Sequence, residues 1–269
     1  MTRGTRLRSW LTTALPPLVT FAVVILGWEL AASTLQSRPY VMPPPSAIVA
    51  ALVANWSADR WPLFVSAQHT FFEALGGLAI GTGVGLAVAF AVSRWASARD
   101  AVLPLAIAAN AIPVIAVAPI MNNWFGVLEP LSKMMIAALL VFFPVMINVT
   151  RGLTVVEPGA LELMRSYAAS EGQILRKLRL PNALPFFLTA LKLGTTLSLI
   201  GAIVGEYFGG SSDVIGRVVV ESASALRFDV TWAAILLGSA AGIAFYLVIA
   251  TTERALIGWH PSVRGEQVA

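Results

Sequence analysis

The stretch LELMRSYAASEGQILRKLRLPNALP, from Leu161 to Pro185, is charged and helix-like in a chain that is otherwise mostly apolar. Only 12% of the 269 residues are charged and the mean hydropathy is +0.78, whereas soluble domains carry roughly 25% charged residues. This composition predicts an integral membrane protein. The chain has no cysteine, which excludes a disulfide framework and a thiolate metal site.

Apolar runs near the roughly 20 residues needed to cross a bilayer lie on both sides of this stretch. They cover about 17–35, 74–92, 101–121, 131–150, 183–205 and 230–250. No long linker divides the chain, and no inverted repeat of the kind found in secondary transporters is evident. We therefore expect an all-α membrane protein with six transmembrane helices in a single domain, residues 1–269. The charged stretch belongs to the loop between the fourth and fifth helices, about 151–182.

The basic residues predict the orientation of these helices. If the N-terminus is cytoplasmic, twelve Lys and Arg residues flank the spans on that side, against five on the other side. The positive-inside rule then places both termini and the 151–182 loop in the cytoplasm. An arginine-led signal peptide is the alternative for the N-terminus. The first apolar run is long enough to span and contains Trp28 and Glu29, which favours an uncleaved helix.

The charged stretch itself predicts a helix, a bend and a second helix. Pro158 suits the first turn of a helix, and Ser170 to Gln173 fits a capping box, with Gly172 easing the bend. Pro181 and Pro185 are expected to punctuate the chain before the fifth spanning helix. A basic, amphipathic element of this kind fits two uses, contact with anionic lipid headgroups or docking into a groove of a soluble partner.

Two short helices are expected on the outer surface. One follows the prolines Pro43–Pro45 with Ser46 as its N-cap, and the other runs from Val214 to Leu226, capped by Ser212 or Asp213. Both could cover a pathway or simply connect the spans.

Small residues and prolines predict how the spans pack. Gly77, Gly81 and Gly85 in the second span and Gly201 and Gly205 in the fifth recur at intervals of four. This spacing lets helices approach closely, either within one subunit or between subunits. Three prolines in the third span predict a bent helix beside a cavity.

Polar residues inside apolar spans are candidates for a solute pathway. Lys192 could attract an anionic solute or snorkel to the cytoplasmic interface, and Glu206 lies beside Tyr207 at the outer end of the fifth span. Glu29 and Glu73 are placed near helix ends, where water would hydrate them. The candidate pathway residues are Asn110, Asn122, Asn123, Asn148, Lys192 and Glu206.

The charged stretch resembles the cytoplasmic EAA loop of ABC importer permeases, whose pattern is Glu-Ala-Ala, three residues, Gly, nine residues, then Ile-x-Leu-Pro. Glu162, Leu180 and Pro181 match this pattern. The departures are Leu163 and Met164 for the alanines, Ala168 for glycine and Leu178 for isoleucine. The segments PPPS, NNWFG, FFPVMINVTRGL and GAIVGEYFGG are similar to the nitrate, sulfonate, taurine and pyrimidine-precursor branch of these permeases.

This resemblance implies a type I ABC importer permease fold in the cell inner membrane, with the loop acting as a coupling helix in a cleft of a cytoplasmic ATPase. It implies a second permease copy, two ATPase subunits, an extracytoplasmic binding protein and surrounding lipid. Glu162 and Arg165 would then make polar contacts, and Tyr167, Ala168 and Ile174 a buried face. The expected coupling residues are Glu162, Arg165, Tyr167, Ala168, Ile174, Leu178 and Pro181.

Other functions leave different traces in a sequence. No Gly-x-x-x-x-Gly-Lys-[Ser/Thr] motif occurs, so ATP and Mg are expected in the partner ATPase, with no cofactor in this chain. His69 and His260 are isolated, and no catalytic or metal-ligand cluster is apparent, which argues against a membrane enzyme. The charges follow topology rather than a nucleic-acid surface. The alternative is a secondary transporter driven by an ion gradient, which would carry a buried carboxylate pair and need no ATPase; a membrane anchor is a third reading.

The solute is not specified by these motifs. Nitrate, alkanesulfonates, taurine, hydroxymethylpyrimidine and a flavin-type vitamin all fit the resemblance. The segment PIMNNWFG favours the pyrimidine-precursor or vitamin side.

Overall fold

The computed structural model describes the backbone of residues 3–34 and 42–257, and side chains from residue 15 onward. These residues form helices and no strands. In chain order they are α1 (Arg3–Thr34), α2 (Pro45–Ala54), α3 (Leu63–Ser93), α4 (Ala96–Ala109), α5 (Val114–Phe125), α6 (Pro130–Thr154), α7 (Pro158–Ser166), α8 (Glu171–Ile174), the π-helix η1 (Leu175–Arg179), α9 (Leu180–Phe208), α10 (Ile215–Ser224) and α11 (Phe228–Ile257).

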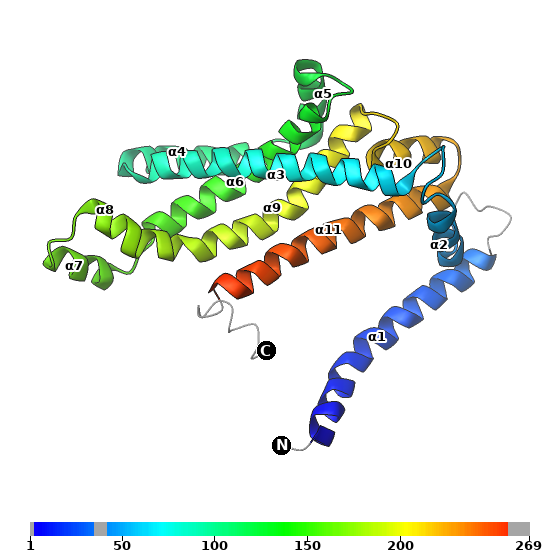
Figure 1. Cartoon of the computed structure of the whole chain (residues 1–269), viewed down its shortest axis with the longest axis horizontal. Helices are drawn as coiled ribbons and strands as arrows, with labels where there is room; N and C mark the ends of the chain where they lie inside the picture. Colours follow the sequence, from blue (N-terminus) through cyan, green and yellow to red (C-terminus); the bar gives the residue numbers. More distant parts are fainter. Residues whose placement is uncertain (1–2, 35–41, 258–269) are drawn as a thin grey trace.

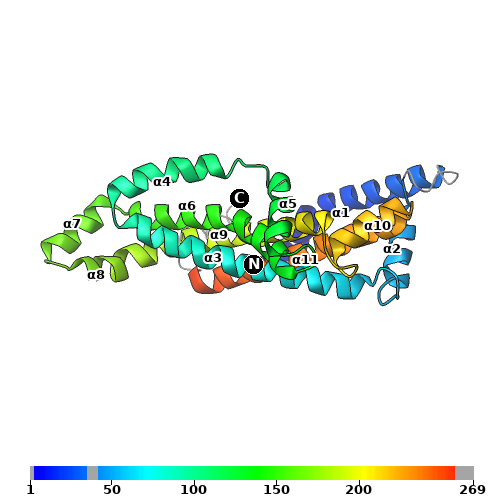
Figure 2. The same cartoon turned by 90° about the horizontal axis from the view of Figure 1, so that it is seen from above.

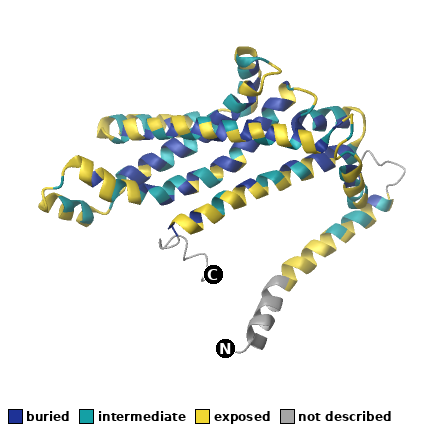
Figure 3. Ribbon diagram, viewed as in Figure 1, coloured by how far each residue is buried: buried dark blue, intermediate teal, exposed yellow. Residues whose placement is uncertain are grey.

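The centre of the bundle is formed by α3, α6 and α9, where the buried residues gather (Figure 3). Glycine allows these helices to touch. A Cβ on Gly77 of α3 would lie 2.8 Å from the Met134 carbonyl oxygen of α6, and one on Gly201 of α9 would lie 2.6 Å from Ala137 Cα. The close approach that the glycine spacing predicts is therefore made within one subunit.

Five segments are long and apolar enough to cross a bilayer: Leu15–Thr34, Leu63–Ser93, Pro130–Thr154, Glu171–Phe208 and Phe228–Ile257. The expected third span, 101–121, is divided between α4 and α5, which are bent by 95° and raise the number to six if taken as one span. Pro113 precedes α5 and has no N–H to donate, and the residue before a proline avoids helical geometry. The bend predicted from the prolines is confirmed.

The first helix leans away from the bundle (Figures 1 and 2). Leu18, Phe21 and Leu30 on α1 are 64%, 67% and 68% exposed. Its C-terminal part is joined to α2 because Glu29 accepts hydrogen bonds from the Ser46 backbone N–H at 3.0 Å and hydroxyl at 2.6 Å. The predicted N-cap role of Ser46 is therefore wrong, since α2 begins one residue earlier and the Ser46 side chain binds another helix.

The loop elements occupy opposite ends of the molecule. Figure 1 shows α7 and α8 at one end of the central helices, and α2 and α10 at the other. The charged stretch therefore projects from the end that lies away from the two short helices.

Candidate coupling segment and buried polar cluster

The charged stretch forms a helix, a tight turn and a second helix, as predicted. The turn is made by Ala168, whose φ of +51° lies in the left-handed region. Glycine reaches this region without the steric cost that a Cβ brings. Ala168 is exposed, so close packing does not restrict the size of its side chain. The backbone conformation is what would favour glycine at this position, as in the EAA pattern.

The second helix is capped as its sequence predicts. The Ser170 N–H donates to Gln173 Oε1 at 2.8 Å, and the Gln173 N–H donates to Ser170 Oγ at 3.4 Å. Gly172 does not form the bend, because it lies inside α8, after the turn at Ala168.

The two prolines after this capped helix do not interrupt the chain. The helix runs without a break from Glu171 through η1 and α9 to Phe208, so the expectation that Pro181 and Pro185 punctuate it is wrong. A π-helical turn just before a proline helps to accommodate its missing N–H and its ring. The second helix of the charged stretch is thus continuous with α9.

The predicted coupling residues differ in exposure. Glu162, Arg165, Tyr167, Ala168 and Pro181 are exposed, Leu178 is half-buried and Ile174 is only 1% exposed. Ile174 packs inside its own chain and supports the segment from behind, whereas no residue of α7 is buried. Tyr167 is 80% exposed and borders a shallow groove of about 280 Å³ with Leu163 and Met164. An aromatic side chain this exposed next to apolar neighbours offers a contact surface.

The four asparagines of the predicted pathway lie on different elements. Asn110 and Asn123 are exposed, at the break after α4 and on α5. Asn122 is buried and its Nδ2 donates to an α9 carbonyl oxygen at 3.5 Å, while Asn148 Nδ2 donates to the Pro144 carbonyl oxygen at 2.8 Å. Within the described residues no hydrogen bond joins one of these asparagines to another.

Lys192 is paired inside the protein. Its Nζ lies 2.6 Å from Glu253 Oε2, and the two side chains are only 19% and 11% exposed. The pair joins α9 to the last turns of α11. It explains how a lysine is tolerated within a span, with no need for an anionic solute as its partner. This partner could not be predicted from the sequence, because Glu253 lies beyond the apolar run expected at 230–250.

Three ionisable side chains, one from each central helix, come together where α6 begins and α9 ends. Glu73 of α3 is 5% exposed, and Lys133 of α6 and Glu206 of α9 are fully buried. The two carboxyl groups interact directly with each other, whereas the lysine acts on both only through its charge, because its Nζ donates to the carbonyl oxygens of Val127 and Glu129. We call Glu73, Lys133 and Glu206 the polar cluster.

The expectation that Glu73 is hydrated near a helix end is therefore wrong. Because α3 begins at Leu63, well before the expected residue 74, Glu73 lies about three turns inside the helix. Lys133, counted as a basic residue flanking a span, is likewise buried.

The polar cluster also holds the start of α10. The Gly216 N–H donates to Glu206 Oε2 at 2.5 Å, and the Ile215 N–H donates to Thr70 Oγ1 at 2.9 Å. The predicted cap by Ser212 or Asp213 is wrong, since the N-cap residue Val214 makes no side-chain cap bond. Side chains from α3 and α9 satisfy these free N–H groups instead.

Asp213 has a different partner. Its Oδ2 lies 2.9 Å from His69 Nδ1 of α3, so His69 is not isolated as its sequence surroundings suggest. The Ser211 hydroxyl, followed by the His69 contact, holds the pKa of Asp213 below its ordinary value. Within the described residues no group of three His, Cys, Asp or Glu side chains is arranged to bind a metal, and His260 lies outside those residues.

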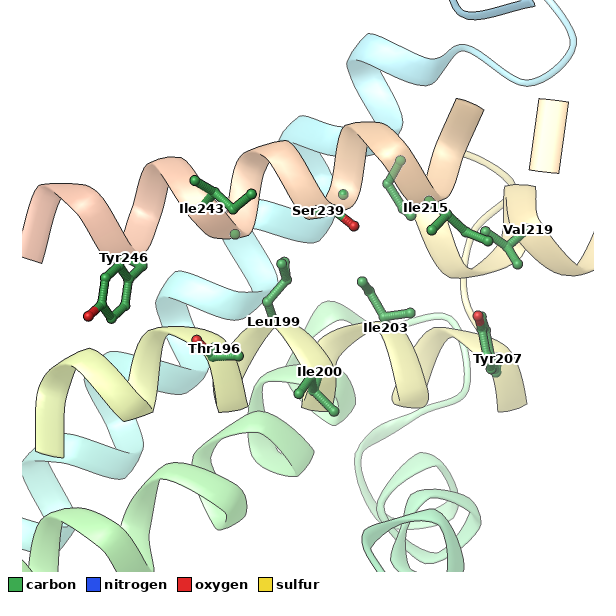
Figure 4. Close-up of a pocket in the computed structure, with 13 residues that line it drawn as sticks. Thr196, Leu199, Ile200, Ile203, Tyr207, Ile215, Val219, Ser239, Ile243 and Tyr246 are labelled. Carbon is green, nitrogen blue, oxygen red and sulfur yellow. The ribbon is translucent and has the colours of Figure 1, made fainter. Parts of the chain in front are cut away.

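A groove of about 500 Å³ lies between α9, α10 and α11 (Figure 4). Most of its lining is aliphatic, from residues such as Leu199, Ile203 and Ile243. No charged residue lines the groove. Its hydroxyl-bearing side chains are Thr196, Tyr207, Ser239 and Tyr246.

The membrane-spanning helices and the exposed, capped segment at one end define the class, a multi-pass α-helical membrane protein. Residues 81–258 match the family described as "Binding-protein-dependent transport system inner membrane component", and the chain belongs to this family.

Two curated relatives are similar over most of the chain. A probable ABC transporter permease protein of Haemophilus influenzae is 32% identical over 87% of this chain and 94% of its own length. The formylaminopyrimidine transport permease protein of Halalkalibacterium halodurans is 31% identical over 91% of this chain and 96% of its own.

A solved structure shows the same fold. A chain from the crystal structure of an amino acid ABC transporter with histidines aligns with a TM-score of 0.59 and 19% identity, covering 72% of this chain and 94% of that one. The predicted family and permease fold are confirmed. The chain is a permease subunit of an ABC importer, that is, a transport subunit. This family membership argues against the secondary transporter driven by an ion gradient.

Proposed function

We propose that this chain forms the translocation pathway for a small solute. We further propose that α7, the turn at Ala168 and α8, together called the coupling segment, dock into a cytoplasmic ATPase. The observation that carries this proposal is the exposure of α7, which buries no residue in its own chain although it is amphipathic. Glu162 and Arg165 supply polar contacts in the dock, and Tyr167 inserts as its aromatic anchor.

The continuous helix supports a coupling role for this segment. Because α8, η1 and α9 form one element, a displacement of the docked segment moves the end of α9 that lies in the bundle. Ile174, buried behind the segment, and Leu178, half-buried in η1, transmit force to the rest of the chain.

The assembly we propose has two permease copies, two ATPase subunits that bind ATP and Mg, and an extracytoplasmic binding protein. Both termini and the coupling segment are cytoplasmic. The charge asymmetry of the loops supports this orientation, and the exposed apolar faces leave room for lipid and for the second copy.

Among the solutes that fit the family, we propose a neutral heterocycle such as a pyrimidine or vitamin precursor. The groove between α9 and α11 has aliphatic walls, four hydroxyl-bearing side chains and no cation, which suits a flat polar ring better than nitrate or a sulfonate. The formylaminopyrimidine permease, at 31% identity, and a riboflavin transport permease of Chloroflexus aurantiacus, at 29%, support this choice.

The docking proposal is tested by purifying the tagged chain gently from its own membranes and counting its partners by mass spectrometry. We expect an ATPase with a phosphate-binding loop at a one-to-one ratio, and its loss in Ala168→Glu, which adds charge at the docking turn. Ala96→Glu, at the exposed start of α4, is the charge-matched control and should retain the ATPase. Recovery of the chain without any ATPase would refute the proposal.

The solute proposal is tested on the copurified binding protein by thermal shift with pyrimidines, riboflavin, taurine, an alkanesulfonate and nitrate. We expect stabilisation by a heterocycle, and loss of its uptake in Ser239→Phe, which fills the groove. Stabilisation by an anion alone would contradict this choice of solute while leaving the ATPase result intact.

A further inference from the structure

If both carboxyl groups of the polar cluster are ionised, its single lysine leaves one negative charge unbalanced. Two carboxyl groups, on Glu73 and Glu206, share one ammonium group, on Lys133, and all three side chains are at least nine-tenths buried. An unbalanced charge buried within membrane-spanning helices is costly. One added proton makes the cluster neutral.

Hydrogen bonding indicates where this proton sits. Glu206 accepts from the Gly216 N–H and also interacts with the Thr70 hydroxyl and with Glu73. A carboxylate that accepts several hydrogen bonds is favoured in its ionised form. Glu73 is therefore the acid that carries the proton, and its O–H donates a hydrogen bond to Glu206.

Two unpaired oxygens support this assignment. Glu73 Oε2 and Glu206 Oε1 are both buried and have no hydrogen-bond donor among the described residues. Two ionised carboxylates cannot satisfy one another, because both only accept, whereas one protonated and one ionised carboxyl can.

We propose that Glu73 and Glu206 together bind a single proton and in that state latch the first turn of α10 to α3 and α9. The proton is taken up from water, and no other bond is made or broken. The latch consists of Glu73, Glu206, Thr70 and the N–H groups of Ile215 and Gly216. Gly216 is required there, since a Cβ on it would lie 2.6 Å from Glu206 Cβ.

Other charged groups near the pair are already occupied. Asp213 is paired with His69, and Arg217 with Glu221 at 2.7 Å, while Lys133 and Glu129 lie on the α6 side and Tyr207 follows Glu206 on α9. Among the residues that the structure describes, only Lys133 is placed to balance the two carboxyls, so replacing either acid should leave a neutral pair without a bound proton. The proton site does not depend on the proposed function.

The proton is detected by infrared spectroscopy of the full chain purified with its partners. We expect the C=O stretch of a buried carboxylic acid at neutral pH, shifted after exchange into D2O. The band should disappear in Glu73→Gln and in Glu206→Gln, because the remaining carboxylate then pairs with Lys133. Asp59→Asn, in the exposed turn after α2, is the control and should retain it. Absence of the band in the unmodified chain, or its persistence in both variants, would overturn the proton site.

The latch is tested separately by hydrogen–deuterium exchange at Ile215 and Gly216, the amides that it holds. Glu206→Ala should speed their exchange by about tenfold or more, the loss expected for a charge-assisted hydrogen bond. Glu206→Gln, which retains an acceptor oxygen, should have a smaller effect, and Asp59→Asn none. Unchanged exchange in Glu206→Ala would overturn the latch. If Glu206→Ala does not fold, the infrared band in Glu206→Gln and Glu73→Gln still tests the proton site. The exchange rates of the two amides in Glu206→Gln still test the latch.

Discussion

Ala168 is the residue at which the turn between α7 and α8 is decided. Its backbone lies at φ +51°, where a Cβ is crowded and glycine is not. The chain therefore carries an alanine at a backbone conformation that glycine adopts more easily.

We predict that Ala168→Gly raises the free energy of unfolding by about 1 kcal/mol, because it removes the left-handed strain at a cost only in chain entropy. Thermal unfolding of the purified complex in detergent measures the change. Gly126→Ala is the converse control, since Gly126 has φ +99°, and it should destabilise the chain. A destabilised Ala168→Gly chain would show that the alanine methyl group matters more than the backbone.

A second residue-scale feature is the ion pair between Lys192 and Glu253, which is almost removed from solvent. Removal of one partner leaves the other charge buried and uncompensated. We predict that Lys192→Met lowers the free energy of unfolding by about 3 kcal/mol, and that Lys192→Met with Glu253→Gln costs less than the single change. Thermal unfolding of both variants provides the comparison. Additive losses would mean that the two residues do not act as a pair.

At the scale of elements, the contact between α3 and α6 depends on the absence of side chains. Gly77 lies directly against the α6 backbone, whereas a Cβ on Gly83 of the same helix would meet no atom within 4 Å. The same residue type thus has opposite roles on two faces of one helix.

We predict that Gly77→Leu costs about 3 kcal/mol or prevents folding, because the added side chain has to displace α6. The matched change Gly83→Leu should alter stability by less than about 1 kcal/mol, since leucine also has the higher helix propensity. Expression level in the membrane and thermal unfolding distinguish the two. Equal tolerance would place the α3–α6 contact elsewhere.

At the scale of the whole molecule, α8, η1 and α9 connect the coupling segment at one end with the α10 latch at the other (Figure 1). A rigid helix transmits displacement, while a flexible joint absorbs it. This connection provides a physical route between the proposed ATPase dock and the opposite face.

We predict that two glycines inserted after Lys177 abolish uptake while the ATPase still copurifies, because the insertion breaks the continuous helix but leaves the docking segment intact. ATP hydrolysis stimulated by the binding protein and solute uptake in proteoliposomes are the measurements. The same insertion between Ala58 and Asp59, in a turn at the opposite end, is the control. Normal uptake after the Lys177 insertion would rule out transmission through α9.

Much of the fold follows from sequence because it rests on local physics. Apolar runs of bilayer length predict spans, prolines predict the break between α4 and α5, and Ser170 with Gln173 predicts a capping box. The two helices of the charged stretch are likewise encoded by neighbouring residues, although the turn between them lies at Ala168 and not at Gly172, where it was expected. Each of these features needs only residues that are close in sequence.

Other features were decided by tertiary structure, since they need residues that are distant along the chain. Glu206 binds the start of α10 and meets Glu73 of α3, and Lys192 finds Glu253. Ser46, Ser212 and Asp213 resemble local caps in sequence, but the packing of other helices against them sets their partners. The sequence by itself determined a multi-pass membrane protein of the permease family with a charged helix–turn–helix segment between two spans. Only the packing of three helices around buried charges, which have to be balanced away from water, determined the polar cluster and its latch.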